Sequence, residues 1–156
     1  MSSIIVGTNT YINFDEFEGY VTNKEWSIDF EDTSKNYWGA ILSSCNIMQK
    51  YIKWKGVKTD STQTLEWPRK YTYDRYGNAY DSASVPQIIK DFQCELAWYI
   101  SKQDQDVLHP HGNVSEFDLG GTLNVKYDVS NSQEVIPVTL MAMISHLGDC
   151  VFNRPT

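Results

Sequence analysis

Histidines and carboxylates gather in one polar stretch of the sequence. His109-Pro110-His111 follows Asp104 and Asp106, and imidazole nitrogens and carboxylate oxygens are common ligands of metal ions. The spacing does not match a zinc finger or an H-E-x-x-H helix, because a rigid proline separates the two imidazoles and His146 lies far downstream. We therefore expect a solvated polar loop here and no bound metal.

No arrangement for nucleophilic or acid–base catalysis stands out. Cys45, Cys94 and Cys150 are odd in number and far apart, so we expect reduced thiols that fill the core of a protein made in a cytoplasm. The sequence has no G-x-S-x-G motif, and Gly120-Gly121 indicates a hairpin turn rather than a phosphate-binding loop. No pair of carboxylates can be singled out as general acid and base. We expect no enzymatic activity and no cofactor.

Positive charge is concentrated in one sixth of the chain. Residues 50–75 hold seven basic and three acidic side chains, a balance of +4, whereas residues 1–49 hold two and seven and residues 76–156 hold four and ten. The whole chain carries a net charge of −7. Nucleic acid binding depends on contacts between phosphates and Lys or Arg. Only the middle segment has the charge to attract a phosphate backbone.

Aromatic residues alternate with these cations, as in single-stranded nucleic acid binders. We nevertheless expect Trp54 and Trp67 to pack inside the protein, because Trp54 continues an apolar helical stripe and Trp67 precedes Pro68 in a turn. The cations expected to remain exposed would then contact an acidic protein surface, such as another copy of this chain in a ring. They are Lys55, Lys58, Arg69 and Lys70.

Apolar periodicity predicts about four helices around these residues. The first follows Asn13, which with Glu16 has the spacing of a capping box. The second has cap candidates at residues 32–34 and an apolar stripe that ends near Trp54. The third begins at Pro86, and the last covers residues 138–147 and ends at Gly148.

Two alternating segments predict a β-hairpin at about residues 114–127. Residues 56–84 form a long connection, and connections of this length in compact domains are usually ordered and packed on themselves. We therefore expect a mainly α fold: a small helical bundle of about four helices with an appended β-hairpin and one long ordered loop.

Length and composition indicate one domain over residues 1–156. Hydrophobic residues make up 41% of the chain and aromatic residues 13%, which is enough for a core and argues against disorder. No apolar run reaches the roughly 18 residues that cross a bilayer. The first residues lack the basic and apolar regions of a secretion signal. We expect neither a membrane association nor a cleaved leader.

The string from residue 54 to residue 97 resembles a tailed-bacteriophage family often labelled DnaT-like single-stranded DNA-binding protein. Asn9-Thr10-Tyr11 before a short aromatic helix also fits, and the resemblance covers nearly the whole chain. The matching residues are Trp54-Lys55-Gly56, Thr59, Ser61, Gln63, Leu65, Trp67-Pro68-Arg69, Asp74, Gly77, Val85-Pro86, Ile89 and Glu95-Leu96-Ala97. Trp54, Gly56, Gln63, Trp67 and Pro68 form its structural signature.

Members of this family resemble phage head–tail connector (adaptor) proteins. The resemblance implies a structural virion protein, made in the host bacterial cytoplasm, that forms a homo-oligomeric ring, commonly of twelve copies, beneath the portal. The ring would extend the DNA channel, let double-stranded DNA pass without specific binding, and dock the tail, stopper or nozzle protein. The docking residues would lie in the hairpin and the C-terminal tail: Phe117, Leu119, Leu123, Phe152 and Arg154.

The family label and the connector role make different physical demands. A single-strand binder needs a basic groove, whereas acidic walls would keep DNA from adhering as it passes through a channel. Both ends of this chain are acidic. We therefore expect a connector at the head–tail junction, with a single-stranded DNA-binding accessory protein of phage replication as the alternative.

Overall fold

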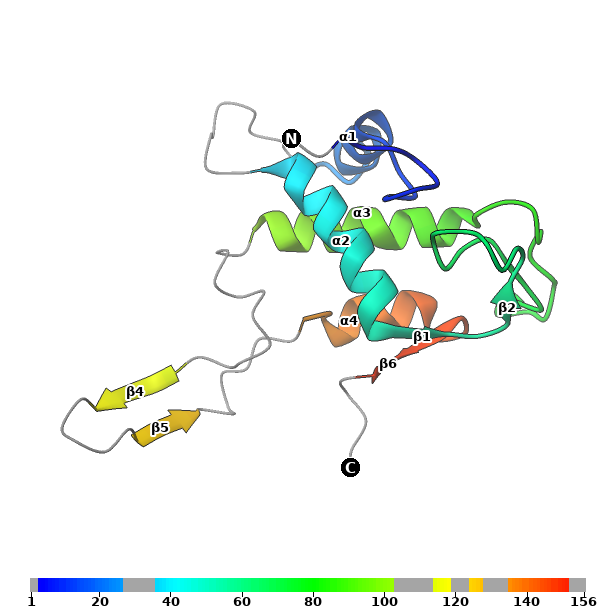
Figure 1. Ribbon diagram of the computed structural model, residues 1–156. Coiled ribbons are helices and arrows are strands. Elements are labelled where there is room, and N and C mark those ends of the chain that lie inside the picture. The colour runs from blue at the N-terminus through cyan, green and yellow to red at the C-terminus, as the bar shows by residue number, and fades with distance from the viewer. Residues whose placement is uncertain (1–2, 27–35, 103–113, 119–123, 128–134, 152–156) are drawn as a thin grey trace.

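The computed structural model describes residues 3–26, 36–102, 114–118, 124–127 and 135–151. It contains four α-helices, a 3₁₀ helix and six short strands within these ranges (Figure 1). The helices are α1 (Phe14–Asn23), α2 (Tyr37–Tyr51), α3 (Gln87–Ser101), α4 (Val138–Met141) and the 3₁₀ helix η3 (Ala142–Ile144). The strands are β1 (Ile52–Trp54), β2 (Val57–Lys58), β3 (Arg69–Lys70), β4 (Val114–Asp118), β5 (Asn124–Tyr127) and β6 (Gly148–Cys150).

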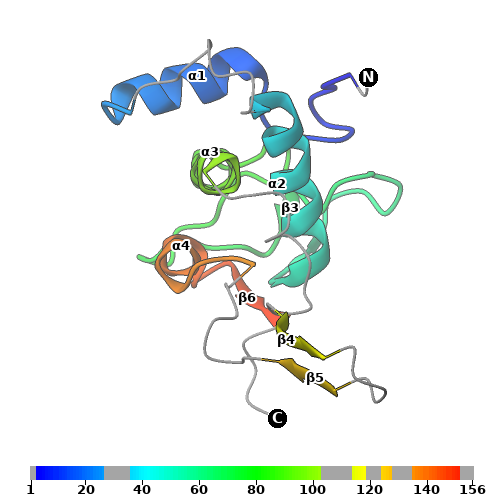
Figure 2. The same cartoon turned by 90° about the vertical axis from the view of Figure 1, so that its left-hand side faces the viewer.

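Helix α3 lies at the centre of this arrangement. Helix α2 crosses it on one side, while α1 and α4 lie on opposite sides of its axis (Figures 1 and 2). None of the helices within the described ranges is long and apolar enough to cross a membrane. The long loop that follows α2 extends to one end of the molecule, next to β2 (Figure 1).

Helix α1 begins as the sequence predicts. The Asn13 side chain accepts a hydrogen bond from the Glu16 backbone N–H at 2.8 Å, and the Glu16 carboxylate accepts one from the Asn13 N–H at 2.8 Å. This reciprocal pair is a capping box. The helix buries Phe17 and Val21, which lie four residues apart on one face.

Three helix ends differ from the prediction. Helix α2 is capped by Asn36 rather than by residues 32–34, and it ends at Tyr51. Its apolar stripe does not continue as a helix, because Ile52–Trp54 forms β1 and pairs antiparallel with β6. The predicted last helix, 138–147, is also wrong: it stops after α4 and η3, and Gly148 lies in β6 opposite Trp54.

The mainly α prediction is therefore wrong, and the fold is a mixture of α-helices and short β-strands. Strands β1 and β6 join the end of α2 to the C-terminal part of the chain, and β2 pairs with β3 inside the predicted long loop. The predicted hairpin is present as the antiparallel pair β4–β5. Its expected turn at Gly120-Gly121 lies outside the described residues.

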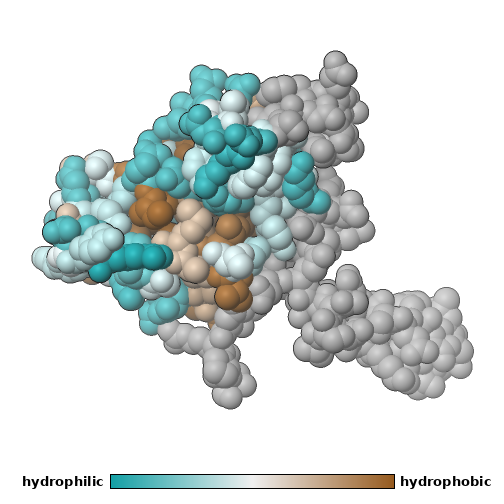
Figure 3. Space-filling model, turned by 180° about the vertical axis from the view of Figure 1, so that it is seen from behind, coloured by the Kyte–Doolittle hydropathy of each residue, from teal (hydrophilic) through white to brown (hydrophobic). Residues whose placement is uncertain are grey.

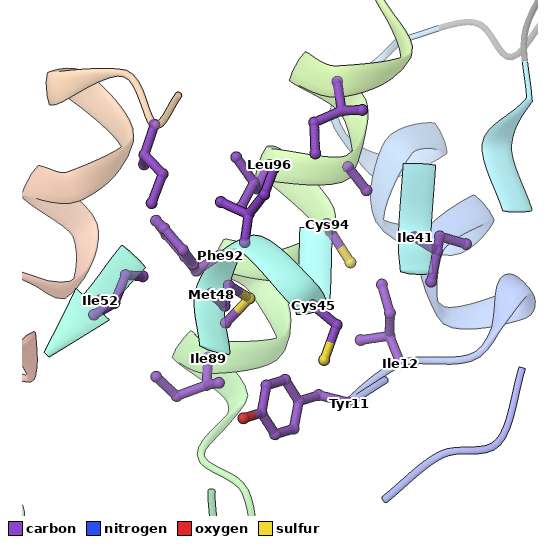
Figure 4. Close-up of a cluster of buried hydrophobic side chains, with 14 of the residues drawn as sticks. Tyr11, Ile12, Ile41, Cys45, Met48, Ile52, Ile89, Phe92, Cys94 and Leu96 are labelled. Carbon is purple, nitrogen blue, oxygen red and sulfur yellow. The ribbon is translucent and has the colours of Figure 1, made fainter. Parts of the chain in front are cut away.

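The core fills the space between α2 and α3. Side chains of both helices point toward one another, and Tyr11 and Ile12 close one end of the cluster (Figure 4). Cys45 and Cys94 are buried free thiols, as expected, and burial raises the pKa of each to about 12. These thiols stay protonated at neutral pH, which suits a packing role.

Gln93 is completely buried among these apolar residues, as are Thr10 and Ser44. The Gln93 amide of α3 accepts a hydrogen bond from the Tyr11 N–H at 3.0 Å. Its Nε2 donates to Thr10 Oγ1 at 2.8 Å and to the Ile41 carbonyl at 3.0 Å. Gln93 therefore joins the N-terminal segment and α2 to α3 at one point.

Apolar side chains also gather on the surface. They form the middle of the face seen in Figure 3, within a hydrophilic border. On helix α4, Val138 is 58% exposed and Leu140 is partly buried against the core. Helix α4 is thus only half covered.

Replacement of Gln93 by Leu tests the buried amide. We expect a loss of about 1–3 kcal/mol in the free energy of unfolding, because the Tyr11 N–H and the Thr10 hydroxyl lose buried partners. Gln87→Leu is the matched control: Gln87 is exposed on the same helix, and its change should stay within about 0.5 kcal/mol. Urea unfolding measures both, and equal effects would contradict the role of Gln93.

Candidate functional site

Both signature tryptophans are buried. Trp54 is 7% exposed and Trp67 is 2% exposed, and their rings meet edge to face with centroids 5.5 Å apart. The prediction that they pack inside the protein is confirmed. Neither ring can stack on a ligand at the surface.

Hydrogen bonds fix the segment around Trp67 against the rest of the fold. The Trp67 N–H donates to the Tyr11 hydroxyl at 3.3 Å, and that hydroxyl donates to Gln49 Oε1 of α2 at 3.0 Å. Gln63 Nε2 donates to the carbonyls of Leu65 and Pro68 at 2.8 and 2.9 Å. The Trp67-Pro68 peptide bond is cis. The signature residues are therefore structural.

Arg69 also belongs to this framework. We expected an exposed cation, but Arg69 is only 7% exposed. Its Nε donates to the Lys55 carbonyl at 2.8 Å and its Nη2 to the Gly56 carbonyl at 2.9 Å. Its Nη1 forms an ion pair with Glu66 at 2.6 Å. Every nitrogen of the guanidinium thus holds the loop, and the prediction that Arg69 is exposed for a partner is wrong.

Gly56 brings the two sides of the loop into contact. Its φ is +70°, and a Cβ at this position would lie 2.2 Å from the Lys70 carbonyl oxygen. A side chain cannot fit there, and the left-handed backbone favours glycine. The backbone of residues 55–57 therefore runs directly beside Lys70 and Tyr71.

The close approach places the exposed Lys55 and Lys70 on neighbouring backbone segments, and Arg75 is exposed five residues further along the chain. We call these three cations the basic face. The Lys55 N–H donates to the Leu147 carbonyl at 2.8 Å, and Arg75 Nη2 donates to the Ala142 carbonyl at 2.6 Å. Lys55 and Arg75 are thus both attached to residues 142–147.

Two other lysines of the region have acidic neighbours. The Lys58 ammonium lies 3.7 Å from the Glu66 carboxylate and is partly buried. Lys53 lies opposite Asp149 in the β1–β6 register. The basic face therefore keeps Lys55 and Lys70 of the four predicted cations and adds Arg75.

A second short loop beside the basic face presents tyrosines. The Asp74 N–H donates to the Asn78 carbonyl at 2.8 Å and the Tyr80 N–H to the Thr72 carbonyl at 2.9 Å, so residues 72–80 fold back on themselves. Thr72 is buried, but three neighbouring tyrosines face solvent. They are Tyr71, Tyr73 and Tyr76, which are 72%, 49% and 92% exposed.

Burial and the charged side chains of this region shift the pKa of His146. Its Nε2 lies 3.2 Å from the Tyr80 hydroxyl. Burial lowers the pKa of His146, the positive charges of Arg75 and Lys55 lower it further, and Asp74 opposes them. Two members of the basic face therefore lie close enough to act on the same imidazole.

A groove of about 480 Å³ lies elsewhere, between α1 and α3. Its charged side chains already have partners, since Lys90 binds Glu16 at 3.0 Å and Asp91 accepts from Gln87 at 2.9 Å. Within the described ranges, no three His, Cys, Asp or Glu side chains are grouped to hold a metal. The predicted histidine loop, residues 104–111, lies outside those ranges.

The predicted docking residues remain largely unplaced. Phe117 belongs to β4, for which the structure gives the backbone. Four others lie outside the described residues: Leu119, Leu123, Phe152 and Arg154. Sequence reasoning missed Arg75 and Tyr76 as site residues, although Tyr76-Gly77-Asn78 indicated a turn that would expose them.

The fold and this site define a small mixed α/β protein with an exposed loop of cations and tyrosines. The chain belongs to the family described as "Putative DnaT-like ssDNA binding protein", whose model matches residues 2–153. Neither a curated protein nor a solved structure matches this chain.

Family membership corrects the expected function. The prediction of a structural virion protein, a head–tail connector that binds portal and tail, is wrong, because the matching family is described by single-stranded DNA binding. The alternative expectation, a single-stranded DNA-binding protein, agrees with the matching family. The single domain, the absence of catalysis, the association with further copies and the place of synthesis stay predictions.

Arg69→Met tests the buried guanidinium. We expect a loss of about 2–4 kcal/mol in the free energy of unfolding, because two loop carbonyls and the Glu66 carboxylate lose their donors. Lys70→Met, at the exposed neighbouring position, is the control and should change stability by no more than about 0.5 kcal/mol. Urea denaturation followed by tryptophan fluorescence compares them. An Arg69→Met protein as stable as the control would refute this role.

His146 predicts a dependence of stability on pH. Its folded-state pKa is below the ordinary value of about 6.5, so the unfolded chain binds a proton more readily than the folded protein. The stability that depends on a neutral His146 imidazole is fully present above about pH 6.5 and is lost as the pH falls toward the pKa of His146 in the folded protein. Relative to His146→Gln, the wild-type protein should lose stability between pH 7.5 and 5.5. The expectation is contradicted if the difference in unfolding free energy between the wild-type protein and His146→Gln is the same at pH 7.5 and pH 5.5.

Proposed function

We propose that this protein binds single-stranded DNA and that the basic face supplies the phosphate contacts. The observation that carries the proposal is the exposure of Lys55, Lys70 and Arg75 within one ordered segment of a chain whose other parts are acidic. Family membership supports the same ligand. Lys55 and Lys70 lie on neighbouring backbone segments, and Arg75 and Lys55 both act on His146.

The acidic remainder of the chain is compatible with this function. Exposed charges separated by more than a Debye length, about 8 Å at physiological salt, are largely screened from one another. A phosphate at the basic face therefore responds mainly to the nearby cations. Acidic surfaces elsewhere, such as Asp15 and Glu16 in the first turn of α1, restrict DNA to one side of the protein.

The salt dependence of binding measures these contacts. Each lysine that neutralises a phosphate on a single strand contributes about 0.7 to the slope of log K against log salt concentration. Lys55→Gln and Lys70→Gln should each reduce the slope by about that amount and weaken binding to a labelled oligothymidylate. Fluorescence anisotropy across a salt series gives both quantities.

Lys24→Gln is the matched control. Lys24 follows α1, away from the basic face, and lies 3.6 Å from Glu95. Its removal should leave the slope unchanged. The proposal fails if the wild-type protein shows no binding to single-stranded DNA, or if all three variants keep the wild-type slope.

A further inference from the structure

The basic face accounts for phosphate contacts but not for the tyrosines beside it. We propose that Tyr71, Tyr73 and Tyr76 form a platform on which unpaired bases stack, so that the site selects single strands over duplexes. This inference rests on the proposed DNA binding and assigns the base-contacting residues. Within the six residues from 71 to 76, three aromatic side chains are between 49% and 92% exposed. Exposed large rings gathered in one place mark an interaction surface rather than a core.

Hydrogen bonds hold the platform in place before any ligand binds. Asp74 Oδ1 accepts from the backbone N–H groups of Tyr76 and Asn78, both at 2.8 Å. Asn78 Nδ2 donates to Asp74 Oδ2 at 2.9 Å, and these bonds lower the pKa of the Asp74 carboxyl. Tyr73 forms an antiparallel bridge with Ala79. An ordered loop loses little conformational entropy on binding, so more of the stacking energy appears as affinity.

The backbone of Tyr71 is a second, independent observation. Its φ is +61°, in the left-handed region that non-glycine residues rarely adopt. Such a conformation costs of order 1 kcal/mol. The ring is 72% exposed, so burial does not offset that cost. Because this strain is not offset by burial, we take the exposed position of the Tyr71 ring to serve a function.

The neighbouring charges match a nucleic acid strand. Lys70 precedes Tyr71 in the chain, and Arg75 precedes Tyr76, so cations and rings alternate along the loop. Single-strand binders place cations along the backbone and aromatic rings against successive bases. Bases in a duplex are already stacked and cannot lie on a side chain. Stacking thus makes single-stranded DNA the preferred ligand, while the cations alone would bind either form.

Substitution by leucine and by phenylalanine separates the ring from the hydroxyl. Tyr71→Leu, Tyr73→Leu and Tyr76→Leu should each weaken binding to an oligothymidylate of about 15 nucleotides by roughly five- to a hundredfold. The phenylalanine variants should bind like the wild-type protein, because a phenyl ring also stacks. None of the six substitutions should alter the slope of log K against log salt concentration, because no phosphate contact changes.

An abasic oligonucleotide of the same length provides the matched ligand. It keeps the phosphates and lacks the bases, so wild-type and leucine variants should bind it equally. Trp38→Leu, an exposed aromatic residue on α2 rather than on the loop, should bind oligothymidylate like the wild-type protein. The platform is refuted if wild-type protein binds oligothymidylate with the expected salt dependence while the leucine variants bind it equally well. It is also refuted if those variants lose as much affinity for the abasic strand. Absence of any wild-type binding would instead refute the proposed function.

Discussion

The buried guanidinium of Arg69 is the constraint on which the exposed loop depends. It donates to the carbonyls of Lys55 and Gly56, which lie between β1 and β2, and to the Glu66 carboxylate, which precedes β3. Arg suits this position because its donors are rigidly arranged and its charge is permanent. With these two parts of the loop so joined, Gly56 lies against Lys70, and the backbones that carry Lys55 and Lys70 are neighbours. One cation is used inside the fold so that its neighbours can be displayed outside it.

The exposed side chains of the proposed binding surface and the buried framework beneath it thus alternate within a few residues of sequence. Trp54, Gln63 and Trp67 face inward and hold the loop, whereas Lys55, Lys70 and Tyr71 face outward. The acidic balance of the two ends favoured the wrong function, because the positive side chains of this chain are concentrated between them. At physiological salt, the potential that a phosphate meets is set by groups within about one Debye length. The distribution of charge was informative, and its sum was not.

Local signals predicted local structure well. The capping box of α1 involves only Asn13 and Glu16, and both partners are visible in the sequence. The β1–β6 pair was missed because Ile52 and Trp54 are too few to distinguish a strand from the end of an apolar helical stripe, and their partners lie almost a hundred residues later. The burial of Arg69 depends on backbone carbonyls, which no side-chain pattern reveals. The turn sequence Tyr76-Gly77-Asn78 suggests that Tyr76 is exposed. The sequence does not show how Tyr76 differs from the tyrosines that pack against the core.

The attachment of the loop to the C-terminal segment also has a consequence for the order of synthesis. Strand β1 finds its partner only in β6, and Lys55 and Arg75 bind carbonyls of residues 142–147. A ribosome therefore releases the loop long before it releases the segment that braces it. During translation, Arg69 can close the loop on itself, but the surface reaches its final form only when residue 150 has emerged. A nascent chain thus completes the basic face last, after the helices that carry it.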